Sequence, residues 1–313
     1  MYEKRLLPYR YEFNRDELDA IKACNDAHGF AVVKGVLPPE LVEALKHSIR
    51  ENFAASLHTS HVFLTPKLTE ELSTAEEEEA DPAAEEITTR TMVDFIEKSD
   101  ALASLMTYEP YMKIVHALYG NQPVTLNRSA AIYKKPGAGT GPWHTDWEPL
   151  EGVYGANAVL NNTGACSNWF YLTGVSPESG GLAIVPDSHT EDWQGFEGFE
   201  LTENCRSFKP VGGSDGPYDR FDFAECLPLY AEPGDLVIFA ERTFHGVFPH
   251  NGSETRLSCA INFRPGISGF AECWPRSEST ERFIASQPPE VQPIVQHYTG
   301  LSFTWKSDQG EAK

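Results

Sequence analysis

The first third of the chain alternates between helical spacing and one apolar run. Residues 14–28 and 40–53 carry apolar side chains every three or four positions, which predicts two amphipathic helices. Between them, the unbroken apolar run 30–33 predicts a buried strand. Residues 91–120 return to helical spacing. We therefore expect residues 1–120 to be mostly helical and to decorate a core formed by the rest of the chain.

From residue 121 onward the pattern changes to short strands separated by turns. The expected strands are residues 124–133, 168–173, 182–185, 236–240 and 257–263. Clusters rich in Gly and Pro lie between them, and this punctuation is typical of a sandwich or barrel. We predict a mainly β fold with helical decoration, organised as one domain of 313 residues. Its parts are the helical 1–120, a β-core over 121–268 and a C-terminal extension over 269–313.

Composition narrows the possible partners. The chain has 25 Lys and Arg against 46 Asp and Glu, a formal net charge of −21, which argues against a nucleic-acid partner. It lacks the run of about 18 apolar residues that a membrane helix needs and starts without an apolar signal segment. We expect a cytoplasmic protein, monomeric or homodimeric, that acts on a small molecule. Its six widely spaced cysteines are expected to be reduced thiols.

The segment 70–86 departs from the rest of the chain because it is dominated by glutamate. Self-repulsion among these carboxylates favours an extended, solvated surface loop. A lid that closes over a substrate is the alternative interpretation.

A candidate metal site begins with His144-Thr145-Asp146. On or beside a strand, positions i and i+2 point to the same side, so the imidazole and the carboxylate can converge on one ion. A third ligand would complete a site of two histidines and one carboxylate. Such a site leaves three metal positions open for a chelating cosubstrate and O₂.

His245 is the preferred third ligand, because it follows the expected strand 236–240 and its preceding turn. His250 is the local competitor. It lies in the sequence Pro249-His250-Asn251-Gly252, which reads as an exposed turn.

A candidate anion site follows eleven residues after His245. The run alternates, so Arg256 and Ser258 share one face of the expected strand, and Leu257 and Cys259 lie on the other. An inward arginine is unfavourable unless it meets an anion, and its guanidinium suits a carboxylate in bidentate geometry. A dicarboxylate cosubstrate would satisfy it.

Other interpretations of the basic residues remain open at this point. Arg256 alternatively forms an ordinary surface salt bridge with Glu254. Arg264 is a second candidate for the anion site, but it precedes Pro265 at the end of the expected strand and reads as more exposed. Lys134 and Lys135 either meet a substrate anion or, as paired lysines before a turn more often do, remain solvated.

Taken together, these motifs resemble one protein family. They are Trp143-His144-Thr145-Asp146, the run from Ser179 to His189, Gly234-Asp235, His245-Gly246 and Arg256. In this order they resemble the phytanoyl-CoA dioxygenase family of Fe(II)- and 2-oxoglutarate-dependent oxygenases. Residues 28–37 also look like the opening helix and strand of that family, so the resemblance runs from about residue 14 to 264.

The resemblance implies a fold and a ligand set. The core would be a double-stranded β-helix, the jelly roll of cupin-like proteins, flanked by the N-terminal helices. His144, Asp146 and His245 would bind Fe(II), and Arg256 would hold the distal carboxylate of 2-oxoglutarate. His189 matches a family motif whose role is usually structural.

One departure from the family concerns the cosubstrate. The family often has a hydroxyl two residues beyond the distal histidine, where this chain has Val247, and Ser258 is our proposed replacement. Asp146 is informative because related halogenases carry a small residue at that place to admit chloride. Halogenation is therefore disfavoured.

The implied activity uses Fe(II), 2-oxoglutarate and O₂. The enzyme would oxidise an unactivated C–H bond of a small metabolite or natural-product intermediate and release succinate and CO₂. Hydroxylation, desaturation and oxidative cyclisation all remain possible outcomes. The competing hypotheses are a jelly-roll metal protein of other chemistry, such as a zinc-type hydrolase or isomerase, and a non-catalytic binding module.

The walls of the substrate site are less defined by the sequence. Six aromatic residues lie near the proposed site in the sequence: Trp143, Trp147, Tyr154, Trp169, Phe170 and Tyr171. They either line the substrate pocket or pack the barrel.

Overall fold

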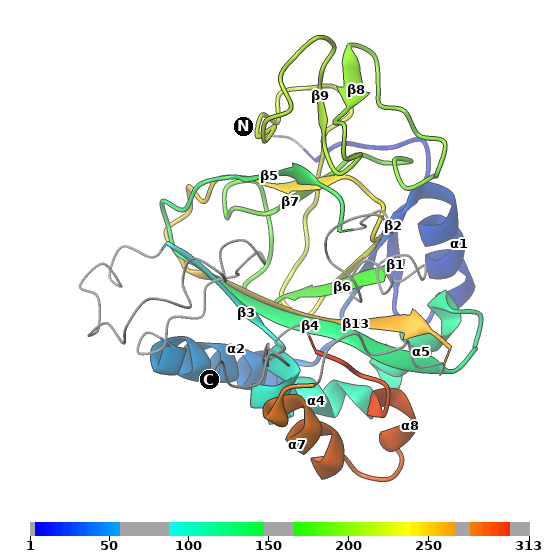
Figure 1. Cartoon of the computed structure of the whole chain (residues 1–313), viewed down its shortest axis with the longest axis vertical. Helices are drawn as coiled ribbons and strands as arrows, with labels where there is room; N and C mark the ends of the chain where they lie inside the picture. Colours follow the sequence, from blue (N-terminus) through cyan, green and yellow to red (C-terminus); the bar gives the residue numbers. More distant parts are fainter. Residues whose placement is uncertain (1–3, 57–87, 147–165, 267–275, 301–313) are drawn as a thin grey trace, which may run out of the picture.

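A computed structural model describes residues 4–56, 88–146, 166–266 and 276–300 of the chain. Two antiparallel sheets form the centre of the molecule, and helices cover one side of it (Figure 1). The acidic segment 70–86, including its alternative role as a lid, lies outside the described residues. Among the described residues, none of the helices is long and apolar enough to cross a membrane.

The larger sheet has seven strands in the order β1-β2-β11-β6-β13-β4-β3. Their bounds are β1 Glu12–Asn14, β2 Phe30–Lys34, β3 Thr89–Val93, β4 Val124–Lys134, β6 Cys166–Tyr171, β11 Leu236–Ala240 and β13 Arg256–Pro265. All neighbours in it are antiparallel except β1 and β2. The sheet thus combines strands from the beginning, middle and end of the described chain.

The smaller sheet has four strands in the order β10-β7-β12-β5 and lies across from the larger one (Figure 1). Its bounds are β5 Gly141–His144, β7 Leu182–Ile184, β10 Leu227–Pro228 and β12 His245–Val247. A separate hairpin pairs β8 Phe199–Leu201 with β9 Phe208–Pro210. Two facing antiparallel sheets of this kind form a jelly-roll core, as expected from the sequence.

Helices cover the outer face of the larger sheet (Figure 1). They are α1 Leu18–His28, α2 Pro39–Ser56, α4 Asp100–Ala103, α5 Glu109–Leu118, α7 Glu278–Ser286 and α8 Gln292–Val295, with 3₁₀ turns η2 Phe95–Lys98 and η3 Ser104–Met106. Their apolar sides join the sheet in one hydrophobic core. The two predicted N-terminal helices are confirmed.

The predicted alternation along β13 is confirmed. Its two faces lie in different environments, the core beneath the helices and the interior between the sheets. Leu257, Cys259 and Ile261 belong to the core beneath the helices, where the hydroxyl of Tyr111 donates to the carbonyl of Ile261 at 2.8 Å. Arg256 lies on the opposite face, toward the interior between the sheets. One strand therefore anchors the helical layer and lines the interior with polar groups.

One part of the helical prediction was wrong. Residues 91–93 belong to β3, which pairs with β4 so that Thr89 lies opposite Lys134 and Val93 opposite Ala130. Pairing with a long neighbouring strand outweighed the local helical spacing. Helical structure begins only at Phe95.

The end of α1 is joined to the segment that carries His245. Gly29 closes α1 with a φ of 79°, and a Cβ there would lie 2.6 Å from the hydroxyl oxygen of Thr243. The Thr243 hydroxyl donates to the Gly29 carbonyl at 2.7 Å. The absence of a side chain at Gly29 thus lets α1 contact the turn that precedes β12.

Candidate active site

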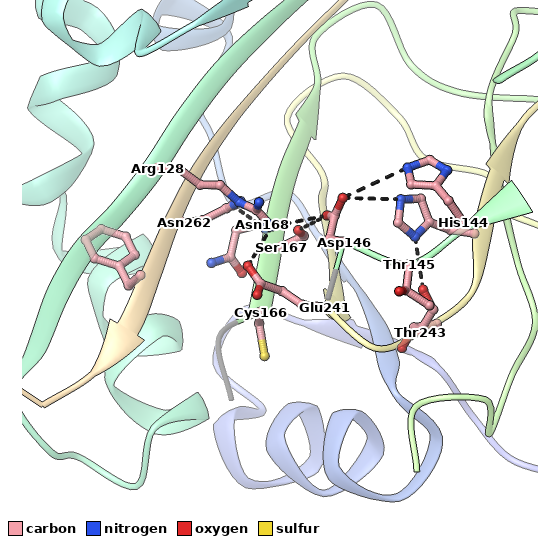
Figure 2. Close-up of polar contacts among 12 residues, drawn as sticks. Arg128, His144, Thr145, Asp146, Cys166, Ser167, Asn168, Glu241, Thr243 and Asn262 are labelled. Carbon is pink, nitrogen blue, oxygen red and sulfur yellow. Dashed lines mark hydrogen bonds and ion pairs between the residues drawn. The ribbon is translucent and has the colours of Figure 1, made fainter. Parts of the chain in front are cut away.

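Two neighbouring strands of the smaller sheet bring the predicted ligands together. His144 is the last residue of β5 and His245 the first of β12, and the two are register partners. Asp146 follows β5, and its Oδ1 lies 4.0 Å from Nε2 of His144 and 3.9 Å from Nε2 of His245 (Figure 2). One ligand atom from each residue lies within 4.8 Å of the other two.

Backbone carbonyls orient both imidazole rings. Nδ1 of His144 lies 2.8 Å from the carbonyl oxygen of Pro142, and Nδ1 of His245 lies 3.0 Å from that of Thr243. A hydrogen bond at Nδ1 leaves Nε2 of each ring as the metal-binding atom. Both Nε2 atoms face the same carboxylate oxygen.

The protonation states of the site suit metal binding. Burial lowers the pKa of His245 to about 4, with a further contribution from His144, so the ring is neutral near pH 7. Burial alone would raise the pKa of Asp146, but Arg128, the two histidines and the Ser167 hydrogen bond hold it well below its usual range. Asp146 is therefore ionised, with its charge directed at the two imidazoles.

The residues present fit a ferrous ion. Two neutral imidazoles and one carboxylate form the donor set of non-haem Fe(II) oxygenases, which leaves positions for other ligands. The second oxygen of Asp146 accepts a hydrogen bond from Ser167 at 2.8 Å, so a single oxygen is left for the ion. The three residues predicted as ligands thus converge in one place.

Arg256 and Ser258 lie on the interior face of β13. The guanidinium of Arg256 is buried, donates to the carbonyl of Gly180 and lies 5.5 Å from the ring of Tyr171. Its Nε has no hydrogen-bond partner in the described part of the chain. The hydroxyl of Ser258 is likewise buried without a partner among the described residues. Both residues have polar atoms left to bind a ligand.

Lys134 is not solvated, which rules out the second of the two interpretations left open for it by the sequence. Lys134 ends β4 opposite Arg256 in the register and is only 3% exposed. Its ammonium donates to the carbonyls of Gly139 and Phe248, each at 2.9 Å. Burial, with a smaller effect of Arg256, lowers the pKa of Lys134 to about 7. This placement depends on the register between β4 and β13, which the period of either strand alone does not predict.

Two other sequence interpretations need correction. His250 is not exposed: it is buried, with Nε2 2.7 Å from the carbonyl oxygen of Glu254, and its Nδ1 accepts from the backbone of Gly252. Its ring therefore closes a turn. Arg264 is also buried, because it lies within β13 and its guanidinium donates to the carbonyl of His297 at 3.4 Å. Arg256 forms no ion pair with Glu254 in the described structure.

The aromatic residues take separate roles. Trp143 packs with Phe208 and Phe221 in a second apolar cluster, and its indole donates to the carbonyl of Arg220. Phe170 packs against Tyr111 beneath the helices. Tyr171 lies beside Arg256. Trp147 and Tyr154 lie outside the described residues.

A cavity of about 600 Å³ opens beside His144. It is lined by residues of β5 and of the segment around the β8–β9 hairpin: Pro142, Trp143, His144, Thr202, Glu203, Asn204, Arg206, Ser207, Asp215, Gly216 and Pro217. The hairpin is tied to the ligand strand, since Ser207 donates to the carbonyl of Trp143 at 2.6 Å. This size accommodates a small organic molecule next to a ligand histidine.

Comparison with known proteins gives the same family as the motifs. The model of the phytanoyl-CoA dioxygenase family matches residues 26–258. A 1-deoxypentalenic acid 11-beta-hydroxylase of Streptomyces arenae is 26% identical over 273 residues, covering 85% of this chain and 88% of the relative. The enzyme of the same name from Streptomyces exfoliatus is 27% identical over 276 residues, with the same coverage of both chains.

Solved structures show the same fold at lower identity. HygX from Streptomyces hygroscopicus, with nickel and 2-oxoglutarate bound, superposes with a TM-score of 0.56 at 16% identity and covers 83% of this chain and 90% of its own. The non-heme alpha ketoglutarate dependent carbocyclase SnoK from nogalamycin biosynthesis gives 0.55 at 16% identity, covering 82% and 87%. Because the family model matches most of this chain, the chain belongs to the phytanoyl-CoA dioxygenase family.

Proposed function

We propose that this protein is an Fe(II)- and 2-oxoglutarate-dependent dioxygenase that oxidises an unactivated C–H bond of a small metabolite or natural-product intermediate. The observation that carries the proposal is the convergence of His144, Asp146 and His245 on one point. Family membership supports the same activity, and two relatives are named as hydroxylases.

Each ligand residue has a defined task. Bound Fe(II) would supply the coupled oxidation of 2-oxoglutarate, to succinate and CO₂, and of the substrate by O₂. His144 and His245 present their Nε2 atoms to the metal, because Nδ1 of each ring faces a backbone carbonyl. Asp146 provides one negative charge, which it keeps at low pH because Arg128 and the histidines stabilise it.

We assign the cosubstrate to the part of the interior beside Arg256. Arg256 and Lys134 form a pair of buried cations, and a carboxylate of 2-oxoglutarate is the anion we assign to them. The unpartnered hydroxyl of Ser258 lies on the same strand face and donates to that carboxylate. This assignment gives Ser258 the hydroxyl role that Val247 cannot fill.

The substrate occupies the cavity beside His144 in this proposal. Oxidation proceeds by hydroxylation, or by desaturation or oxidative cyclisation when the substrate is held so that oxygen transfer is slow. The carboxylate of Asp146 at the third ligand position disfavours halogenation. We further propose one dioxygenase domain over the whole chain, a cytoplasmic location, and a monomer or homodimer.

The first test uses the wild-type protein without oxygen. Anaerobic addition of Fe(II) and 2-oxoglutarate should give a weak charge-transfer absorption band, which a zinc-type hydrolase or isomerase would not show. With O₂ and ascorbate, the protein should form succinate. Screening a metabolite extract by mass spectrometry should then reveal substrate shifts of about +16 or −2, the mass changes of oxygen insertion and desaturation.

Variants tie the activity to the ligands. His144→Ala should lose iron-dependent succinate formation and bind metal at least about 100-fold more weakly, because loss of even an outer partner of a metal ligand costs 10–100-fold. His47→Ala is the matched control, since His47 is exposed on α2, where it pairs with Glu51. Unchanged turnover in His144→Ala would remove the proposed site.

A further inference from the structure

An ion pair with a buried carboxylate and a partly buried arginine lies behind the candidate ligand Asp146. Arg128 is in β4, and Glu241 follows directly after β11. Arg128 Nη2 lies 2.6 Å from Oε1 of Glu241, whose side chain is only 2% exposed. In Figure 2, Arg128, Ser167 and Glu241 lie on the side of Asp146 away from His144.

The two oxygens of Asp146 have different surroundings. Oδ1 faces Nε2 of both histidines, at 4.0 and 3.9 Å. Oδ2 accepts from Ser167 at 2.8 Å and lies 3.5 Å from Nη2 of Arg128. The polar groups behind the carboxylate thus engage one oxygen and leave the other for the metal.

The same guanidinium nitrogen is shared between the two carboxylates. Arg128 Nη2 is much closer to Glu241, at 2.6 Å, than to Asp146, at 3.5 Å. An arginine next to a single carboxylate prefers a bidentate pair that engages both oxygens. In that arrangement Arg128 would compete with the metal for Oδ1 of Asp146.

We propose that Glu241 is a positioning residue: it holds the Arg128 guanidinium back from Asp146, so that Oδ1 of Asp146 stays directed at the metal. This inference rests on the proposed metal site. Glu241 itself touches neither metal nor cosubstrate in this arrangement. It acts through Arg128.

The unfavourable burial of Glu241 supports a functional role. Its Oε2 is buried without a hydrogen-bond partner among the described residues. Burial raises the pKa of Glu241 to about 8 despite the neighbouring Arg128. An ion pair whose buried carboxylate keeps an unsatisfied oxygen is poor evidence of stabilisation, because an apolar pair of similar volume often serves the fold as well.

The test is a double-mutant cycle read by Mn(II) binding to the metal-free protein. Glu241→Gln keeps the side-chain volume but replaces the carboxylate that accepts from Arg128 with an amide. We expect it to weaken Mn(II) binding by about 10–100-fold, the range for partners behind a metal ligand. Adding Arg128→Met to Glu241→Gln removes the competing cation and should restore most of the lost affinity.

Controls separate positioning from a general loss of structure. Asp235→Asn breaks another buried carboxylate, which pairs with Lys34 and accepts from the backbone of Gly35. It should lower the midpoint of urea unfolding without changing Mn(II) affinity. The absorption spectrum of bound Co(II) gives a second readout, since it should shift in Glu241→Gln and return in the double variant.

Three outcomes would overturn the inference. Wild-type Mn(II) affinity in Glu241→Gln would show that Glu241 does not position the site. Equal loss in the single and double variants would assign the effect to damaged packing. If the wild-type protein bound no Mn(II), the proposed metal site would fail first, and the role of Glu241 with it. Should Glu241→Gln not fold, Glu241→Asp replaces it in the cycle: its shorter side chain holds Arg128 less closely, so it should weaken Mn(II) binding, and wild-type affinity in it would overturn the inference.

Discussion

The β4–β13 strand pair carries a partly buried cation midway along β4 and two buried cations at its other end, and their partners differ. Near the predicted metal ligands, Arg128 lies against the carboxylates of Glu241 and Asp146. At the other end, Lys134 and Arg256 are register partners, and neither has a carboxylate within ion-pair distance in the described part of the chain. Backbone carbonyls are their hydrogen-bond acceptors there.

This difference separates two uses of a buried positive charge. A cation that meets protein carboxylates is already neutralised and can orient one of them. Two adjacent cations without a carboxylate are electrostatically incomplete, and a bound anion would complete them. The interior therefore has a metal end and an anion end, on the same two strands.

The largest contrast is expected in protein stability without ligands. Arg128→Met leaves the buried Glu241 and the partly buried Asp146 without their cation, and should lower the free energy of unfolding by up to about 3–5 kcal/mol. Arg256→Met removes a cation that has no partner charge, so it should change stability little or raise it. Urea unfolding of the metal-free proteins measures both. Equal losses would break the distinction between the two ends.

For cosubstrate affinity, in contrast to stability, the larger effect is expected at Arg256. Arg256→Met should weaken 2-oxoglutarate binding by about 2–5 kcal/mol, or roughly 30- to 4,000-fold in Kd, because it removes one partner of a buried charge pair. Arg256→Lys should recover only part of this, since it cannot form the bidentate pair. Titration of the Fe(II) protein under nitrogen measures the Kd. An unchanged Kd in Arg256→Met would place the cosubstrate elsewhere.

The pH dependence of cosubstrate binding tests Lys134. Its pKa is lowered to about 7 by burial, so the free protein holds Lys134 protonated below that pH and neutral above it. A bound carboxylate favours the protonated form, so binding above pH 7 must take up a proton. The Kd for 2-oxoglutarate should rise by up to about tenfold per pH unit above about pH 7. Lys134→Met should abolish this slope, and a slope that persists would exclude Lys134.

Ser258 should give the smallest effect. Ser258→Ala should weaken 2-oxoglutarate binding by about 0.5–1.5 kcal/mol, the net value of one hydrogen bond. Protein stability should stay near wild type, because the hydroxyl has no partner among the described residues. Ser129→Ala is the matched control on the opposite face of the sheet: its hydroxyl accepts from the backbone of Ile96, so it should affect stability and leave binding unchanged. Identical behaviour of the two variants would remove Ser258 from the anion end.

Local patterns were sufficient for the two N-terminal helices, for the longer strands and for the choice of candidate ligands, but not for short strands such as β5 and β12. The alternation along β13 placed Arg256 and Ser258 on one face, and the spacing of His144 and Asp146 placed two ligands together. Both predictions depend only on the period of a strand. The strand β3 was missed because its pairing with β4 depends on a distant partner.

The burial and the partners of charged side chains could not be predicted from local patterns. The sequence around Lys134 looks like a solvated turn, and the one around His250 looks the same, yet both side chains are buried. The link from Glu241 through Arg128 to Asp146 joins three segments that have no sequence signal in common. Neither burial nor these pairings can be read from neighbours along the chain.

The sequence by itself determined the family motifs, the candidate ligands, and the shared side of His144 and Asp146 and of Arg256 and Ser258, because these depend on residue identity and on the two-residue strand period. Only the tertiary structure decided that β5 and β12 pair so that His144 meets His245, and that Lys134 joins Arg256. Register between distant strands is set by the packing of both sheets and the helices. The electrostatic environment of each charge follows from that packing.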